Sequence, residues 1–539
     1  MEQTKTALAQ TRHASRAGVR VSNVLTGIVF VLFAAVFLFL SVCGLLQTSV
    51  IDAKDYIKEH ILFYSDSAWL NLGVFVLLAV LAAAAVFLLG KRVRQKHVRI
   101  AKVVLVCWTF GLSLFWSLGV QTVPTADSRA ILNAASLAAQ GDFSFFADKQ
   151  QYFQMFPFQL GIVGLYEIFF RVFGGFAGKA LYAFNAVSLA AACLAVVQTA
   201  QAVFKDRRVT LATIVLLALC IQPVLFSSFL YGVLPGLAAM AWAAYFLIRF
   251  LQTEQKLNIL WIALLCAFGV AVKPNNWIAV AAFCIVLAVS LLTKFRPARI
   301  LCMLAVVIAP LVLTYGVRFA YERRADVDLG GGTPQTAWLV MGLSDSSRAP
   351  GWYNGYTYSV LKDSGWDTDL AAETVRQDLK ARMQALAADP DYAADFFFQK
   401  VLSQWNEPSF ESIWSSKARE HEEPVSAFIQ NVYDGALGDA LTNYFEHYTQ
   451  FVYVFAAVSL LPFSRRRKTP AGDDAEGLHV GRLEAAVPVL IVLGGFCYHL
   501  LFEAKSYYAI PYFVLLMPYA AFGLVRFARL FERRAQKTP

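Results

Sequence analysis

Long apolar runs separated by short polar segments dominate this chain. A run of about 17 to 25 apolar residues lets a helix cross the hydrocarbon core of a membrane. About a dozen runs satisfy this condition, and we expect each to form a membrane-spanning helix. The predicted spans are 24–46, 69–90, 100–123, 179–203, 209–227, 231–250, 257–273, 276–293, 300–319, 449–463, 484–502 and 507–527.

Clusters of Lys and Arg orient these spans, because basic loops face the cytoplasm. The clusters at 91–96, 205–208, 294–299 and 465–468 all fall on one side if twelve spans alternate, and both termini are then cytoplasmic. The apolar run 157–173 disturbs this alternation if it also crosses. It carries Glu167 and Arg171 four residues apart, which suits a helix lying at the outer membrane surface. We therefore predict a juxtamembrane helix there.

Composition supports a membrane protein and excludes several other classes. Hydrophobic residues make up 58% of the 539 positions and charged residues only 16%, which leaves too little polar surface for a soluble globule. The net charge of +10 comes from loop clusters, so it does not indicate nucleic-acid binding. All eight cysteines lie in apolar runs, which predicts neither a disulfide framework nor a Cys-ligated metal, and no HExxH spacing suggests a zinc hydrolase.

The expected fold is an all-α integral membrane protein of about 12 transmembrane helices with a small external helical subdomain. Residues 1–100 hold a cytoplasmic tail and two extra spans, and 101–319 form a core whose first external loop is 124–178. Residues 320–450 form an acidic external cap, and 451–539 hold the last spans and a basic tail. Within the cap, helix-start residues and apolar spacing predict helices at 369–388 and 392–405. The segment 51–68 is predicted as an outer loop.

Several short sequence stretches on the outer side resemble one known family. They are a span followed by 126–128 (Ala-Asp-Ser), the helix end 137–144, Tyr152 with 156–161 (Phe-Pro-Phe-Gln-Leu-Gly), the Lys-Pro turn at 269–275 and the late outer turn at 502–511. In this order the chain resembles the GT-C membrane glycosyltransferases that use polyprenyl-phosphate sugars, the group that includes protein O-mannosyltransferases and lipid A aminoarabinose transferases. The resemblance covers most of the chain, with two additional spans in front.

The resemblance implies an inverting sugar transfer at the outer face of a bacterial plasma membrane. The donor would be a polyprenyl-phosphate sugar, the acceptor a glycan, lipid or protein, and membrane lipids would surround the enzyme. Asp127 would be the general base, while Lys273 and Lys505 would hold the lipid phosphate, with Arg318 as a further candidate. Other candidate substrate contacts are Asn275, Asn276, Asp142, Tyr152, Gln159, Glu503, Tyr507 and Trp405.

The departing phosphate is a weak base, so a second carboxylic acid is not required, in contrast to glycoside hydrolysis. Related enzymes often carry an acidic residue in the outer turn that here reads 226–232 (Phe-Ser-Ser-Phe-Leu-Tyr-Gly), and none is present. No metal ligands are predicted, no cofactor is expected with certainty, and a divalent metal is left open.

Other roles for the same residues stay open. Asp127 precedes an apolar helix and could serve as its N-cap, and Lys273 could extend along the bilayer to the outer interface. Arg318, Arg323 and Arg324 could form a solvated cluster. A transporter or flippase of lipid-linked sugars would share the spans and outer cations, but it predicts interrupted helices in matching halves. A structural assembly partner would tolerate replacement of Asp127.

Overall fold

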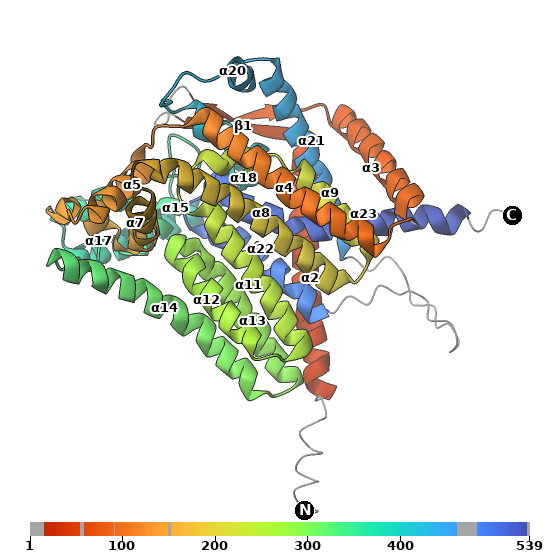
Figure 1. Cartoon of the computed structure of the whole chain (residues 1–539), viewed down its shortest axis with the longest axis horizontal. Helices are drawn as coiled ribbons and strands as arrows, with labels where there is room; N and C mark the ends of the chain where they lie inside the picture. The colour runs from red at the N-terminus through yellow and green to blue at the C-terminus, as the bar shows by residue number, and fades with distance from the viewer. Residues whose placement is uncertain (1–15, 54–58, 91, 149–151, 461–481, 536–539) are drawn as a thin grey trace, which may run out of the picture.

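The computed structural model describes residues 16–53, 59–90, 92–148, 152–460 and 482–535, and this part of the chain is almost entirely helical (Figure 1). Twelve of its helices overlap the predicted spans. They are α2 (Arg16–Leu46), α3 (Ala68–Gly90), α4 (Gln95–Val120), α8 (Ala177–Phe204), α9 (Arg207–Leu219), α11 (Val233–Thr253), α12 (Leu257–Val272), α13 (Trp277–Thr293), α14 (Pro297–Ala325), α21 (Ala436–Ser459), α22 (Arg482–Leu501) and α23 (Ile510–Ala535).

The multi-pass membrane organisation is supported, but the count of twelve is not. Within the described ranges, nine helical segments are long and apolar enough to cross a membrane. A tenth results if α9 and the short helices after it, α10 (Gln222–Leu225) and η4 (Phe226–Ser228), form one span bent by 45°. Helix α12 has only 16 residues, and the first half of α21 is polar, so neither meets the same condition.

Burial separates central helices from lipid-facing ones. In the apolar part of α23, 89% of the residues are buried inside the protein, against 11% for α3 and 17% for α14. Side chains such as Leu81, Leu304 and Val312 are apolar and exposed on these outer helices. Such surfaces are stable only against hydrocarbon, so α3 and α14 lie at the perimeter of the bundle.

The segment predicted to be juxtamembrane forms α7 (Leu160–Phe173), which is preceded by α6 (Tyr152–Met155) and η2 (Pro157–Gln159). Gly174, at φ +53°, and η3 (Gly174–Phe176) separate α7 from α8. Figure 1 looks nearly along α7 while α8 runs across the view. Whether α7 lies at the membrane surface stays a prediction.

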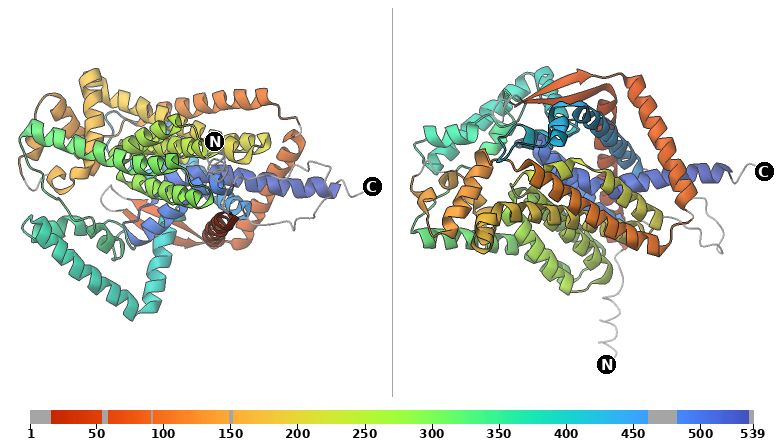
Figure 2. Two further views of the ribbon diagram at one scale, coloured as in Figure 1. Left: turned by 90° about the horizontal axis from the view of Figure 1, so that it is seen from below. Right: turned by 45° about the horizontal axis from the view of Figure 1, so that its top comes forward.

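The segment predicted as an outer loop instead contains an antiparallel hairpin of β1 (Gln47–Ala53) and β2 (Glu59–Ser65), in register from Gln47 opposite Ser65 to Ala53 opposite Glu59. Apart from this hairpin, the elements of the described residues are all helices, which supports the expected all-α membrane fold. The hairpin is stable here because its edges bond to the cap. The amide of Ile61 donates to the carbonyl of Arg348 at 3.0 Å, and that of Ser49 to Asn406 at 3.2 Å. Figure 2 shows it above the bundle, beside the cap.

The cap contains α15 (Ala337–Gly342), α16 (Tyr356–Asp363), α17 (Thr368–Ala388), α18 (Pro390–Trp405), α19 (Trp414–Lys417) and α20 (Ala427–Asp434). The two predicted cap helices are confirmed as α17 and α18. Asp367 caps α17 by accepting from two backbone amides. Helix α21 begins at Ala436, well before the predicted start at 449. Of the basic clusters used to orient the spans, 465–468 and the first residue of 91–96 lie outside the described residues.

Candidate functional site

A cavity of about 800 Å³ lies where the cap meets the ends of the spans predicted to face outward. Its walls come from α5 (Ala126–Ala139), η2, the turn between η4 and α11, η5 (Pro274–Asn276), α14, the cap and η6 (Ser506–Ala509). Eight of the residues selected from sequence line it: Asp127, Tyr152, Gln159, Lys273, Asn275, Glu503, Lys505 and Tyr507. Segments distant in sequence thus share one polar cavity.

Asp127 faces this cavity from the first turn of α5, and a chain of hydrogen bonds fixes its position. Tyr231 donates from its hydroxyl to Oδ2 of Asp127 at 2.8 Å, and Gln159 donates to the same hydroxyl at 2.9 Å. The N-cap position of α5 is held by Thr125, so Asp127 is not the N-cap. The residue before it, Ala126, has φ +48°, a strained conformation for a non-glycine residue. The carboxylate is therefore held by both the backbone turn and a tyrosine.

Lys273 contacts the ring of the same tyrosine, Tyr231. It follows the end of α12, and its Nζ lies 3.9 Å from the centre of the Tyr231 ring. Burial lowers the pKa of Lys273 from 10.5 to about 8, although Asp127 and Glu503 act in the opposite direction. Asp127 and Lys273 form no ion pair within the described structure, so both charges remain available for a ligand.

Lys505 belongs to a buried charge cluster that sequence reasoning did not find. Its Nζ lies 3.0 Å from Oε1 of Glu59 on the hairpin and 3.5 Å from Oε2 of Glu411 in the cap. Arg348 bonds the same Oε1 of Glu59 at 2.7 Å. Burial alone would lower the pKa of Lys505, but the nearby carboxylates of Glu411 and Glu59 have a larger effect, so the pKa is raised. Burial also raises the pKa of Glu411, more than Lys505 lowers it.

The loop that carries Glu411 is strained and tightly bonded. Phe410 and Glu411 both have positive φ, at +49° and +56°. The preceding carboxylate, Glu407, accepts from the hydroxyls of Ser409 and Ser506 at 2.5 and 2.7 Å. Burial raises the pKa of Glu407 against these hydrogen bonds. The loop is thus fixed to the turn that carries Lys505.

Glu503 completes the same turn. Its carboxylate accepts from the Tyr508 hydroxyl at 3.3 Å, and burial raises its pKa to about 7, with Lys505 acting in the opposite direction. Glu503 forms no ion pair with Lys505 in the described structure, although the two residues are separated by only one position. The carboxylates that pair with Lys505 are those of Glu59 and Glu411.

Four residues selected from sequence lie elsewhere. Arg318 pairs with Glu322 at 2.8 Å on α14, and Asp142 accepts from the Ser144 amide in an exposed turn. Trp405 is buried against Phe496 and Tyr512 in the core. Asn276 uses its side chain to bond the carbonyls of Gly269 and Lys273, which stabilises the turn around Lys273. The ligand-binding roles of these four stay predictions that the geometry does not favour.

The cavity also contains residues that the sequence did not single out for this role: Glu59, Arg348, Arg419, Glu411 and Tyr231. Arg419 stacks over Phe229 at 4.7 Å and donates to Thr125 at 3.0 Å. For Glu411 and Arg419, the concentration of polar residues in 403–419 is a sequence feature that could have pointed to them, whereas Glu59, Arg348 and Tyr231 lie outside that stretch. Within the described ranges, no group of three or more His, Cys, Asp or Glu side chains is arranged to hold a metal ion.

Comparisons with known proteins give no family for this chain. No family model matches it, and no curated protein matches it. Among solved structures, the archaeal oligosaccharyltransferase AglB from Archaeoglobus fulgidus, in complex with an inhibitory peptide and a dolichol-phosphate, is similar over 80% of this chain. The identity is 15%, the TM-score is 0.36, and this chain spans about half (51%) of the AglB chain.

Proposed function

We propose that this protein transfers a sugar from a polyprenyl-phosphate donor to an acceptor hydroxyl at the outer face of a bacterial plasma membrane, with inversion. The observation that carries the proposal is the arrangement of Asp127, Tyr231 and Lys273. A carboxylate at the hydroxyl of one tyrosine and an ammonium group over the ring of the same tyrosine face one cavity. The sequence resemblance to GT-C glycosyltransferases supports the same reading.

In this mechanism Asp127 takes the proton of the acceptor hydroxyl, whose oxygen attacks the anomeric carbon. The bond from that carbon to the phosphate oxygen breaks, and its electron pair leaves with the polyprenyl phosphate. Lys273 and Lys505 stabilise the charge that develops on the phosphate. No acid is needed on the leaving side, because a phosphate is a weak base.

The charge of the cavity supports an anionic donor. With the pKa of Glu411 raised by burial, the cluster around Lys505 has two cations, Lys505 and Arg348, and one carboxylate, Glu59, which leaves a charge of +1. The rest of the lining adds the cations Lys273 and Arg419 and the carboxylates Asp127 and Glu503, and burial raises the pKa of Glu503 to about 7, so the cavity keeps an excess of positive charge. A phosphate-linked substrate fits this potential, whereas a neutral free sugar gains nothing from it.

The cavity wall also supports a lipid-linked substrate. Leu311, Thr314 and Tyr315 of α14 line it, and α14 is the perimeter helix with apolar side chains on its outer surface. Leu311 and Tyr315 are 38% and 64% exposed. An isoprenoid tail can therefore follow α14 into the bilayer while its phosphate occupies the polar cavity.

A transporter or flippase is the alternative, and it predicts interrupted helices in both halves of the chain. The described residues contain one broken helix pair, bent by 45° between Leu219 and Gln222. No specific observation favours transport over transfer.

The decisive experiment measures release of radiolabelled sugar from polyprenyl-phosphate donors by purified protein in detergent. Asp127→Asn should reduce transfer by about 10²- to 10⁴-fold, the usual contribution of a positioned base. Asp391→Asn, an exposed carboxylate at the start of α18, is the matched control and should behave as wild type. Lipid binding without turnover by wild type and variant alike, across a broad donor and acceptor panel, would instead favour the flippase.

A further inference from the structure

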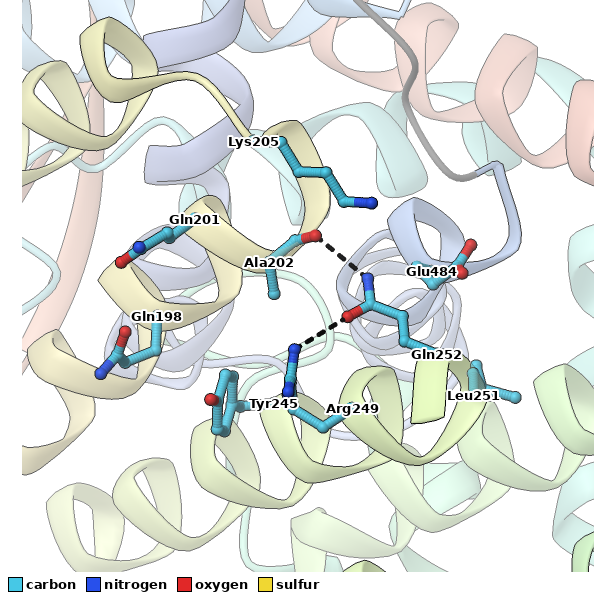
Figure 3. A pocket seen from close by; sticks show the side chains of 9 residues that line it. All are labelled: Gln198, Gln201, Ala202, Lys205, Tyr245, Arg249, Leu251, Gln252 and Glu484. Atoms are coloured by element: carbon cyan, nitrogen blue, oxygen red, sulfur yellow. Dashed lines mark hydrogen bonds between the residues drawn. The ribbon is translucent and has the colours of Figure 1, made fainter. Parts of the chain in front are cut away.

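A second polar cavity lies at the opposite, predicted cytoplasmic, ends of the helices. It has a volume of about 760 Å³ and is shown in Figure 3. Helix α8 contributes Gln198 and Gln201, and its C-cap residue Lys205 also lines the cavity. Helix α11 contributes Tyr245, Arg249 and Gln252, and α22 contributes Glu484. The proposed sugar transfer makes no use of this cavity.

Hydrogen-bond donors dominate its walls. Lys205 and Arg249 extend into it from two different helices, as Figure 3 shows. Neither forms an ion pair with any carboxylate in the described part of the chain, and Arg249 makes only a long hydrogen bond of 3.4 Å to Gln252. Two unpaired cations facing the same space create a positive potential that favours an anion.

The glutamines on α8 add neutral donors. Lys102 of α4 donates to the side-chain oxygen of Gln198 at 2.8 Å and of Gln201 at 2.7 Å. Because lysine only donates, these contacts leave the amide NH₂ groups of both glutamines as donors that make no hydrogen bond in the described structure. Glu484 is the single acidic group of the lining.

The position of the cavity matches the headgroup level of the membrane. Lys205 ends α8 in a left-handed C-cap, and Arg249 lies in the last turns of α11, both next to basic loops predicted to be cytoplasmic. Basic pockets between membrane helices on this side bind the phosphate groups of anionic lipids. The helices themselves supply the apolar surface along which acyl chains can lie.

We propose that this cavity binds the phosphate group of an anionic ligand, with Lys205 and Arg249 as its cationic contacts. The chemistry is shared by the headgroup of an anionic phospholipid and by a soluble phosphate compound, and the open cavity admits both. Glu484 opposes binding, because its carboxylate faces the same space. The site is independent of the proposed sugar transfer.

The test uses the full-length protein in detergent and native mass spectrometry, titrated with phosphatidylglycerol or with phosphatidylcholine. Phosphatidylglycerol should bind more tightly, and Lys205→Gln and Arg249→Gln should each weaken it about fivefold, which corresponds to ~1 kcal/mol per basic residue. Glu484→Gln should strengthen it. Lys256→Gln, an exposed cation in the α11–α12 loop outside the cavity, removes the same charge and should change little.

Competition by inorganic pyrophosphate distinguishes the two sources. Pyrophosphate binding that depends on Lys205 and Arg249 identifies a soluble phosphate ligand, and binding of phosphatidylglycerol alone identifies a lipid headgroup. The proposal is overturned if Lys205→Gln and Arg249→Gln affect binding no more than Lys256→Gln. It is equally overturned if wild type neither prefers phosphatidylglycerol nor binds pyrophosphate. Glu484→Gln is expected to raise the affinity, and a variant that had lost its fold would not show such a gain.

Discussion

Nζ of Lys505 lies 3.0 Å from Oε1 of Glu59, although 446 positions separate the two residues. The contact joins the first outer hairpin to the last outer turn. Arg348 of the cap bonds the same oxygen at 2.7 Å, so three outer segments converge on one buried carboxylate. The position of Lys505 in the cavity thus depends on a strand near the other end of the chain.

Replacing Glu59 with Gln should destabilise the protein, because two buried cations lose their carboxylate. Removing one partner of a buried ion pair costs about 3–5 kcal/mol, and we expect the lower end, since Glu411 can ionise in compensation. Thermal unfolding of the purified protein measures the loss. Asp52→Asn, an exposed carboxylate on the same hairpin, is the control. An unfolding midpoint equal to that of wild type would mean that Glu59 does not hold the three segments together.

Replacing Tyr231 with Phe removes the hydroxyl between Asp127 and Gln159 but keeps the ring beside Lys273. A hydrogen bond to a charged group contributes about 1.5–3 kcal/mol, so transfer should fall roughly 10- to 100-fold without loss of folding. Tyr358→Phe, at another tyrosine of the cavity lining, is the comparison. Equal rates for both variants would show that the Tyr231 hydroxyl does not position the base.

Binding of a polyprenyl phosphate should weaken as the pH rises through about 8. Lys273 has its pKa lowered to about 8 by burial, so it is cationic below this pH and neutral above it. Burial raises the pKa of Glu503 to about 7, so its carboxyl group becomes negatively charged as the pH rises through about 7. This negative charge also weakens anion binding as the pH rises. Dissociation constants measured from pH 6 to 9 test this expectation.

Two variants separate these contributions. Lys273→Arg should remove the decrease in binding affinity near pH 8, because a guanidinium stays charged over the whole pH range. Glu503→Gln should remove the decrease in binding affinity near pH 7 and leave the decrease near pH 8 in place. A profile that is unchanged in both variants would assign the pH dependence to other groups.

Lys400 of the cap should be essential for stability. Its buried ammonium donates to the carbonyls of Gly342, Leu500 and Phe502, and burial lowers its pKa to about 7. Lys400→Met leaves three buried carbonyls unpaired, which we expect to cost about 3 kcal/mol. Lys380→Met, on the exposed face of α17, is the control, and the unfolding temperature is the measurement. A midpoint as high as that of the control would contradict this role.

Hydropathy and charge predicted most of the helical framework, because helices in a bilayer must satisfy their own backbone hydrogen bonds. Hydropathy and charge did not predict the hairpin. There the amide of Ile61 donates to the backbone of the cap, a hydrogen bond between segments that are distant in the sequence. Hydropathy and charge also failed to settle the number of spans, since α12 is short and α21 is half polar.

The candidate site was predictable where a single charged residue ends a span, as with Asp127 and Lys273. It was not predictable where function depends on tertiary contact. Glu59 and Glu411 have no local sequence feature that connects them with Lys505, because their pairing arises only when hairpin, cap and last turn come together. Tyr231 lies in a turn that had been considered only for the acidic residue it lacks.

The ring of Tyr231 contacts two groups of opposite charge through different parts of its structure. Its hydroxyl donates to the carboxylate of Asp127, while Nζ of Lys273 lies 3.9 Å from the centre of its ring. One aromatic side chain thus sets the spacing between a proton acceptor and an anion receptor. An incoming ligand can therefore contact both groups without first breaking an ion pair between them.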